Sequence, residues 1–209
     1  MWSSEQLRLF LDSTAGDELG VLWRFLAATG CRRGEALGLR WSDVDLAART
    51  ATIVRQRTIA SGSVVEGSPK TSAGARTVSL DNGTVAALRL RHRQQAQDRL
   101  AAGRSWIDTG LVFTHQNGGG LWPQMVTARF KQSALVLGLP HIGVHGLRHT
   151  AATFMIASGI NPKVVQQRLG HAHVSVTLGL YTHVLPAHDR EAKPRHCWVT
   201  RSENSVTNP

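Results

Sequence analysis

Apolar residues recur at helical spacing along most of this chain. Ser3 and Gln6 have the spacing of a capping box and predict the start of a first helix. A second helix is expected to begin at Asp17 and to end at Gly30, because glycine is typical of helix C-termini. Its predicted core face consists of Leu19, Leu22, Trp23 and Leu26. The pattern therefore predicts that the chain opens with two helices.

Residues 50–80 leave the helical period. Two short β-branched stretches, 51–54 and 76–80, are separated by turn residues at 61–63 and 68–69. We expect a small antiparallel sheet here, with Lys70 at a hairpin tip and Arg76 just after the turn. A lysine at a tip usually serves only solubility, but this one is notable because the chain contains few lysines.

Two further helices are predicted in the middle of the chain. The first, at 84–101, has a basic side that is either a solvated face or a surface that contacts a nucleic-acid backbone. That side consists of Arg89, Arg91, Arg93 and Arg99. After a short strand at 111–114 and a glycine turn at 118–120, Pro123 begins the second helix, which ends near Gly138. Its apolar positions are Val126, Phe130 and Leu135.

Candidate phosphate-binding groups occur beside two of the helices. The apolar stripe near residue 150 consists of Leu147, Ala151, Phe154 and Met155. His145 and Arg148 lie one turn apart on that helix, about 100° from the stripe. A guanidinium beside an imidazole suits a phosphate, because arginine grips two oxygens at once. Near the second helix, Glu35 follows Arg32 by three positions and is expected to hold its guanidinium.

A short helix precedes the last candidate residues. Asn161 and Pro162 predict its start, and Gly170 predicts its end. His171 follows at once, and helical spacing resumes in the next segment, so that Tyr181 falls near a helix end.

These elements predict an α+β fold that is mostly helical and contains a small antiparallel β-sheet. With 209 residues, 42% of them hydrophobic and 18% charged, the chain is expected to form one well-buried domain and is unlike disordered proteins. The net charge of +10 favours a polyanion, with nucleic acid ahead of an anionic membrane surface. Arginine outnumbers lysine, which fits phosphate recognition and is also produced by a GC-rich genome.

Cysteine use and hydropathy indicate a reducing compartment. The two cysteines, Cys31 and Cys197, do not make a disulfide framework, and Cys31 lies in an apolar context typical of a buried residue. The sequence contains no secretory signal and no apolar run near the ~18 residues of a membrane span. We expect a cytoplasmic protein with no membrane partner.

In their order along the chain, the candidate motifs resemble those of the tyrosine recombinases, the phage integrase family. Residues 30–35 are similar to the family's Gly-x-Arg-x-x-Glu motif, 145–148 to its His-x-x-Arg motif, and 169–171 to the Leu-Gly-His that precedes its tyrosine. The resemblance covers residues 2–192. The expected residue types fill the six family positions Arg32, Lys70, His145, Arg148, His171 and Tyr181.

This resemblance implies the fold of a tyrosine recombinase catalytic domain and the activity of a site-specific recombinase or integrase of a mobile element. Tyr181 would form a 3′-phosphotyrosyl bond with double-stranded DNA, without metal, ATP or another cofactor. Arg32 and Arg148 would hold the non-bridging phosphate oxygens, with Glu35 in a supporting role. Bacterial relatives of this kind imply a nucleoid-associated protein.

The resemblance also assigns the remaining groups. His145 is the candidate for proton exchange with Tyr181, and His171 would donate a hydrogen bond to the phosphate. Lys70 would protonate the departing 5′ oxygen. Arg76 and His149 are expected to contact DNA.

Domain organisation follows from the same likeness. Residues 1–185 correspond to the catalytic domain, and the N-terminal core-binding domain of the family is not among these residues. Residues 186–209 form an atypical tail that is expected to be disordered, because Pro194 interrupts any helix and a polar end follows. A homotetramer on DNA is expected only together with the N-terminal domain.

Three alternatives remain open at this stage. His145, His149, His171 and His173 are potential zinc ligands, although Arg148 beside the first pair opposes a dication. A type IB topoisomerase-like enzyme would use the same chemistry to nick and close DNA without exchanging partners. From a different class, the chain would be a truncated DNA-binding remnant that does not recombine.

Overall fold

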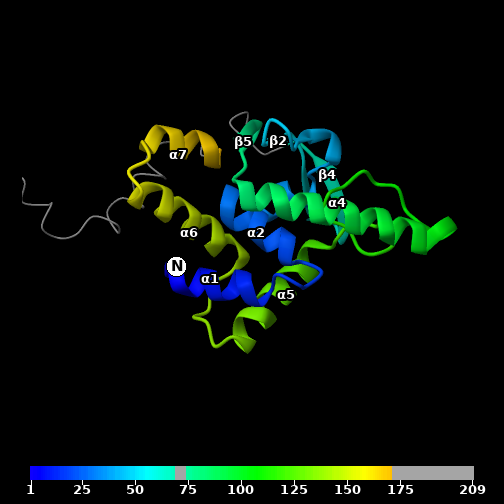
Figure 1. Ribbon diagram of the computed structural model, residues 1–209, viewed down its shortest axis with the longest axis horizontal. Coiled ribbons are helices and arrows are strands. Elements are labelled where there is room, and N and C mark those ends of the chain that lie inside the picture. The colour runs from blue at the N-terminus through cyan, green and yellow to red at the C-terminus, as the bar shows by residue number, and fades with distance from the viewer. Residues whose placement is uncertain (69–73, 171–209) are drawn as a thin grey trace, which may run out of the picture.

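Helices dominate the structure, and a small β region lies beside them (Figure 1). The computed structural model describes residues 1–68 and 74–170. Its α-helices are α1 (Ser4–Ser13), α2 (Gly20–Thr29), α3 (Arg33–Leu37), α4 (Asn82–Ala102), α5 (Pro123–Val136), α6 (Val144–Ala157) and α7 (Pro162–Leu169). Two short 3-10 helices are η1 (Trp41–Asp43) and η3 (Gly103–Ser105). The α+β, mostly helical prediction is confirmed.

Helix ends follow local side-chain chemistry. The capping box of α1 is present: Ser3 accepts a hydrogen bond from the Gln6 backbone, and the Gln6 side chain accepts one from the Ser3 backbone. Helix α2 ends at Gly30, whose φ of 66° is left-handed. It begins at Gly20 and not at Asp17, because the carbonyl of Asp17 accepts from the Gly20 N–H at 2.9 Å in a preceding turn.

The strands form two antiparallel groups, whereas the change of period predicted one small antiparallel sheet. Strands β1 (Val44–Asp45), β2 (Thr50–Ile53) and β5 (Arg76–Ser79) make a three-stranded sheet in the order β1-β2-β5. Strands β3 (Gln56–Ala60) and β4 (Ser63–Gly67) make a separate hairpin. Their register brings Arg57 opposite Glu66. The segment 69–73, which includes Lys70, lies outside the described residues.

The predicted strand at 111–114 is wrong. Only isolated bridges occur there, between Arg40 and Leu111 and between Thr114 and Gly120. Side chains of α4 take the carbonyl groups that a sheet partner would use: Gln95 donates to Leu111 O, and Arg91 donates to the carbonyls of Val112 and Thr114.

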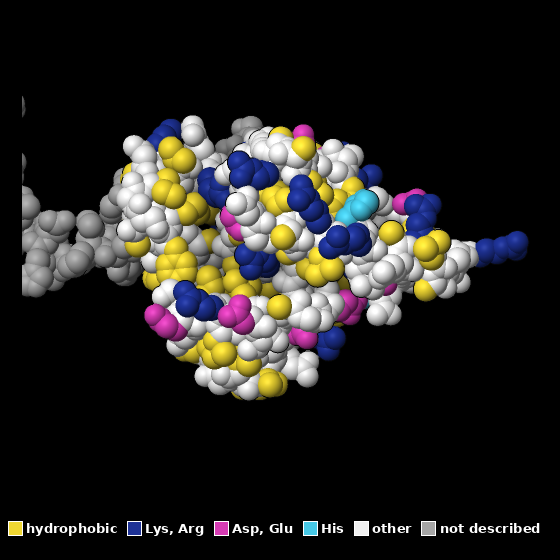
Figure 2. Space-filling model, viewed as in Figure 1, with side chains coloured by type: hydrophobic (Ala, Val, Ile, Leu, Met, Phe, Trp, Pro, Cys, Tyr) yellow, Lys and Arg dark blue, Asp and Glu magenta, His cyan; other side chains and the backbone are white. Residues whose placement is uncertain are grey.

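The prediction of a basic exposed face on α4 is wrong at Arg91. It was expected on the exposed side, but it is only 8% exposed, and it faces Asp98 at 3.6 Å. Arg89, Arg93 and Arg99 are exposed. Figure 2 shows Lys and Arg side chains gathered along α4 and the adjoining β region, whereas Asp and Glu lie mainly over α1.

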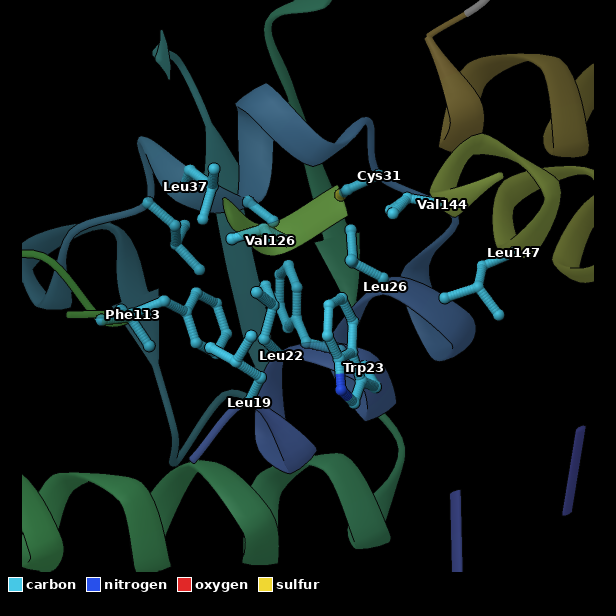
Figure 3. Packing of buried hydrophobic residues seen from close by; sticks show 14 of the residues in the cluster. Leu19, Leu22, Trp23, Leu26, Cys31, Leu37, Phe113, Val126, Val144 and Leu147 are labelled. Carbon is cyan, nitrogen blue, oxygen red and sulfur yellow. The ribbon is translucent and has the colours of Figure 1, made fainter. Parts of the chain in front are cut away.

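Helix α2 lies at the centre of the core, between α4 and α6 (Figure 1). Its apolar side chains meet Leu37 of α3, Val126 of α5 and Phe113 in one cluster (Figure 3). An aromatic group of Trp2, Phe10, Trp23 and Phe130 closes one side, with ring centroids 5.0 to 6.2 Å apart. Leu135, expected to be apolar core, is 79% exposed, and Ala134 is buried in its place.

Helices α6 and α7 pack on each other through a second, smaller apolar cluster. It consists of Ala152, Ile156, Val165 and Leu169, with Met155 packed against it. Asn161 caps α7 by accepting from the Lys163 N–H, and Gly170 ends it with a φ of 67°, as predicted. Across the described ranges, no helix is both long and apolar enough to span a membrane.

Candidate active site

Arg148 lies at the bottom of the candidate site. It comes from the second turn of α6, and one of its nitrogens, Nη1, donates to the carbonyl of Gly30 at 2.8 Å. The residue is only 3% exposed, so the expectation that it stands well away from the buried stripe is wrong. Its other terminal nitrogen, Nη2, is buried and has no hydrogen-bond partner among residues 1–68 and 74–170. A buried guanidinium nitrogen without a partner is costly, because it has lost its water.

Arg32 and Glu35 form the ion pair that their spacing predicted. Arg32 Nη1 lies 2.7 Å from Glu35 Oε1, and the Arg32 backbone N–H donates to Glu35 Oε2 at 3.0 Å. Glu35 is 1% exposed, whereas the Arg32 side chain is 38% exposed. The buried carboxylate therefore fixes an arginine that is partly open to solvent. Arg32 Nη2 also reaches the carbonyl of Gly170 at 3.4 Å.

Arg76 shares the same carboxylate. Its Nη2 donates to Glu35 Oε2 at 2.8 Å, and its side chain is 7% exposed. Arg76 was expected to contact DNA, and this geometry does not fit that role, because the guanidinium points inward and is used by protein acceptors. The contact of Arg76 with Glu35 spans 41 residues of sequence, so helical spacing could not predict it.

Positive charge is crowded around Glu35. Burial alone opposes ionisation of Glu35, but the hydrogen bond and charge of Arg76, followed by those of Arg32, outweigh it and hold the Glu35 pKa below its ordinary value. Burial and then the charge of Arg32 lower the pKa of Arg148 to about 10. Two arginines bind the one carboxylate and a third, Arg148, is near enough to feel its charge, which leaves an excess of cations that an anion would stabilise.

His145 and His149 are exposed on the first turns of α6. Their rings meet edge to face, with centroids 4.9 Å apart. Partial burial of the ring, then the proximity of His149 and the charge of Arg148, lower the pKa of His145. Burial and Arg148 lower the pKa of His149 as well. Both imidazoles are therefore favoured in the neutral form, which accepts a proton.

An open groove of about 670 Å³ leads from this cluster across the surface. Arg32, Arg33 and His145 line it together with residues of β3 and of the start of α5. The sequence analysis singles out neither of two further cations of the groove. Arg33 donates a hydrogen bond to the hydroxyl of Thr127 on α5. Arg57 of β3 is held by the carbonyl of Leu121 and by Glu66, and only the sheet register could have placed it here.

The other expected catalytic groups, Lys70, His171 and Tyr181, lie outside the described residues. The structure does describe two residues that are near these positions in sequence: Gly170, next to His171, and Gly74, four residues after Lys70. Gly170, which precedes His171, lies against Arg32, and Gly74 accepts a hydrogen bond from Arg76 at 2.8 Å.

The part of the chain that the structure describes contains no cluster of side chains that could bind zinc. Within residues 1–68 and 74–170, no three His, Cys, Asp or Glu side chains are close enough together to hold a metal ion. The two further histidines of that alternative, His171 and His173, are beyond this range.

Similarity to known proteins agrees with the fold. Residues 5–188 match the phage integrase family. A tyrosine recombinase XerC-like protein of Caldanaerobacter subterraneus subsp. tengcongensis is 30% identical over 197 residues, which cover 88% of this chain and 50% of the relative. The integrase of Staphylococcus phage L54a is 27% identical over 176 residues, covering 81% of this chain and 49% of that protein.

Solved structures show the same architecture. The crystal structure of XerA recombinase superposes with a TM-score of 0.71 at 24% identity, covering 91% of this chain and 62% of that one. The Tn1549 transposon integrase in complex with transposon right end DNA gives a TM-score of 0.74 at 25% identity, covering 86% of this chain and 60% of that one.

The fold and the family match together define a tyrosine recombinase catalytic domain. The chain belongs to the phage integrase family, because the family match extends over residues 5–188 of its 209. It spans about half the length of the relatives that it matches.

Proposed function

We propose that this chain cleaves and rejoins double-stranded DNA at specific sites through a covalent 3′-phosphotyrosyl bond to Tyr181. One observation carries the proposal: Arg32 and Arg76 bind the single carboxylate of Glu35, and nearby Arg148, whose pKa their charges influence, keeps one buried nitrogen without a partner among the described residues. A phosphodiester supplies the missing acceptor and the missing negative charge.

The phosphate would bind between Arg32 and Arg148. Attack on phosphorus creates a pentavalent transition state with extra charge on the non-bridging oxygens, and preorganised cations stabilise this charge more than that of the ground state. Glu35 keeps Arg32 in place before the substrate arrives, which lowers the cost of ordering it during the reaction.

Proton movement would use the neutral imidazole of His145. The ordinary pKa of tyrosine is about 10, so forming a phenolate at pH 7 costs roughly 4 kcal/mol. The lowered pKa of His145 leaves it free to accept the proton of Tyr181. Tyr181 Oη then bonds to phosphorus while the bond from phosphorus to the 5′ oxygen breaks. Lys70 donates a proton to that oxygen, and His171 donates a hydrogen bond to the phosphate.

Neither metal nor ATP takes part in this proposal. The phosphotyrosyl bond conserves the energy of the phosphodiester, and a different 5′ hydroxyl reverses the attack to reseal the strand. Charge compensation comes from guanidinium groups, so no divalent ion is required to offset the transition-state charge. DNA is the proposed partner, and the Tn1549 transposon integrase was solved with DNA bound. A tetramer on DNA belongs to the same proposal, for a protein that also carries a core-binding domain.

A nicked suicide substrate tests the function. It carries a candidate site and loses a short 5′-hydroxyl fragment upon cleavage, so that the covalent intermediate accumulates. We expect an SDS-resistant protein–DNA adduct that forms in excess EDTA and is abolished by Tyr181→Phe, while DNA affinity changes little because only one hydroxyl is lost. An adduct that persists in Tyr181→Phe, or that requires an added metal ion, would contradict the proposal.

A further inference from the structure

All three nitrogens of the Arg76 guanidinium are engaged, each by a different segment of the chain. Nε donates to the carbonyl of Arg168 at 2.6 Å, in the last turn of α7. Nη1 donates to the carbonyl of Gly74 at 2.8 Å, and Nη2 donates to Glu35 Oε2 at 2.8 Å. The side chain is 7% exposed, so water does not compete for these acceptors.

Each of these acceptors either contacts a residue of the proposed reaction or is close to one in sequence. Glu35 holds Arg32 from the other carboxylate oxygen. The carbonyl of Arg168 lies two residues before Gly170, whose own carbonyl contacts Arg32 Nη2 and whose next residue in sequence is His171. Gly74 directly follows the segment 69–73, which contains Lys70.

A guanidinium is planar and rigid, so its three nitrogens fix their acceptors relative to one another. The acceptors of Arg76 come from α3, α7 and the chain just before β5. We propose that Arg76 is a positioning residue for DNA cleavage: it holds Glu35, the end of α7 and Gly74 in one fixed arrangement. This inference rests on the proposed function and adds a residue that does not touch DNA.

Arg91 is a matched comparison within the same molecule. It too is a buried arginine that donates to backbone carbonyls, those of Val112 and Thr114. Those acceptors hold α4 to residues 112–114, and within the described part of the chain no hydrogen bond joins them to Arg32, Glu35 or α7. Loss of either guanidinium removes buried hydrogen bonds, but only loss of Arg76 should reach the phosphate-binding arginine.

The test replaces the planar fork and keeps the charge. Arg76→Lys in the full chain is compared with Arg91→Lys, and three quantities are measured: the midpoint of thermal unfolding, the ¹⁵N–¹H signal of the Arg32 guanidinium, and the single-turnover rate of adduct formation. The Arg32 signal is assigned by its loss in Arg32→Lys. It should be protected from solvent exchange in the wild type, because Arg32 donates to a buried carboxylate at 2.7 Å.

We expect both lysine variants to lower the unfolding midpoint by comparable amounts. Only Arg76→Lys should also broaden the Arg32 signal and slow cleavage by about 10²-fold, the effect of a small displacement of a catalytic group. Glu35→Gln removes the carboxylate that joins Arg76 to Arg32 and nearly keeps the shape of the side chain. It should also broaden the Arg32 signal, and it shows how large the effect is when the partner of Arg32 is lost directly. If Arg76→Lys does not fold, Arg76→Gln, which keeps two N–H donors, takes its place in the comparison with Arg91→Gln.

Folded Arg76→Lys with an unchanged Arg32 signal and an unchanged cleavage rate would overturn the inference. Equal effects of Arg76→Lys and Arg91→Lys on cleavage would overturn it as well, because stability alone would then explain them. The Arg32 signal does not depend on catalysis. A wild-type protein that forms no adduct would therefore contradict the proposed function, while the signal would still decide whether Arg76 positions Arg32.

Discussion

A single buried carboxylate organises the site at the level of residues. Glu35 accepts hydrogen bonds from Arg32 on one oxygen and from Arg76 on the other, and it is the only acidic side chain that is buried among the described residues. Removing one partner of a buried ion pair is costly, because the remaining charges lose both water and their counter-ion.

Glu35→Gln should therefore lower the free energy of unfolding by about 3–5 kcal/mol at pH 7. The pKa of Glu35 is held below its ordinary value of 4.5, so its ionised form stabilises the fold above that pH. This contribution is lost as the pH falls through the depressed pKa. Urea denaturation of both proteins between pH 7 and pH 2 measures the difference, which should shrink in acid.

Glu66→Gln is the control for that comparison. Glu66 pairs with Arg40 and Arg57 at the surface and is 39% exposed, so its loss should cost no more than about 1 kcal/mol. A Glu35→Gln protein as stable as the wild type, or a difference that does not change with pH, would contradict the role given to Glu35.

At the level of elements, the position of α7 depends on Gly30. This residue has a φ of 66°, and a β-carbon placed on it would lie 2.5 Å from Leu169 Cδ2. Arg168 adds hydrogen bonds from α7 to the hydroxyl and the carbonyl of Ser79 and to the carbonyl of Ala28. The left-handed end of α2 therefore provides the space in which α7 packs.

Gly30→Ala should destabilise the protein and also slow cleavage. The left-handed conformation alone costs an alanine about 1–2 kcal/mol, and the added methyl group must displace Leu169. Gly138→Ala is the matched control, because its φ is 63° and nothing lies within 4 Å of the added carbon. Unfolding free energies and adduct rates are measured for both. If Gly138→Ala slows cleavage as strongly as Gly30→Ala, displacement of α7 is not the cause.

The helices were predictable because helix formation is local. Periodicity and capping residues such as Ser3 and Asn161 place their starts, and Gly30 and Gly170 place two of their ends. Side chains that serve distant segments were not predictable. Arg91 has the spacing of an exposed residue, but it is buried because unpaired carbonyls at 112–114 need a donor.

The candidate site likewise contains features that local sequence predicts and features that depend on distant segments. The pair of Arg32 and Glu35 follows from helical spacing, and motif resemblance supplied the other expected positions. The burial of Arg148 and the inward direction of Arg76 depend on how α3, α6, α7 and β5 meet. No pattern within one element specifies such a junction.

At the scale of the whole molecule, charge sets how the chain meets DNA. The net charge is +10, and the groove beside the arginine cluster contains Arg33 and Arg57. Each phosphate contact adds about −0.9 to the slope of log affinity against log salt concentration. We therefore expect binding by these 209 residues to depend strongly on salt.

Arg33→Gln should reduce the magnitude of that slope by about 0.9 if the groove tracks the DNA backbone. Arg89→Gln, on the exposed face of α4, should leave it unchanged. Fluorescence anisotropy with duplex DNA between 50 and about 300 mM salt measures both slopes in the range where counter-ion release dominates. The opposite outcome would place the DNA on α4 and would contradict the groove assignment.

The central claim is that Arg148 neutralises charge on the scissile phosphate. A methylphosphonate at that position replaces one charged non-bridging oxygen with a methyl group and removes the need for this neutralisation. Adduct formation by Arg148→Ala on phosphate and on methylphosphonate DNA is the direct measurement, with Arg91→Ala as the control for loss of a buried guanidinium. We predict that Arg148→Ala is inactive on phosphate and regains activity on methylphosphonate, whereas Arg91→Ala shows no such preference. Equal inactivity of Arg148→Ala on both substrates would contradict the claim.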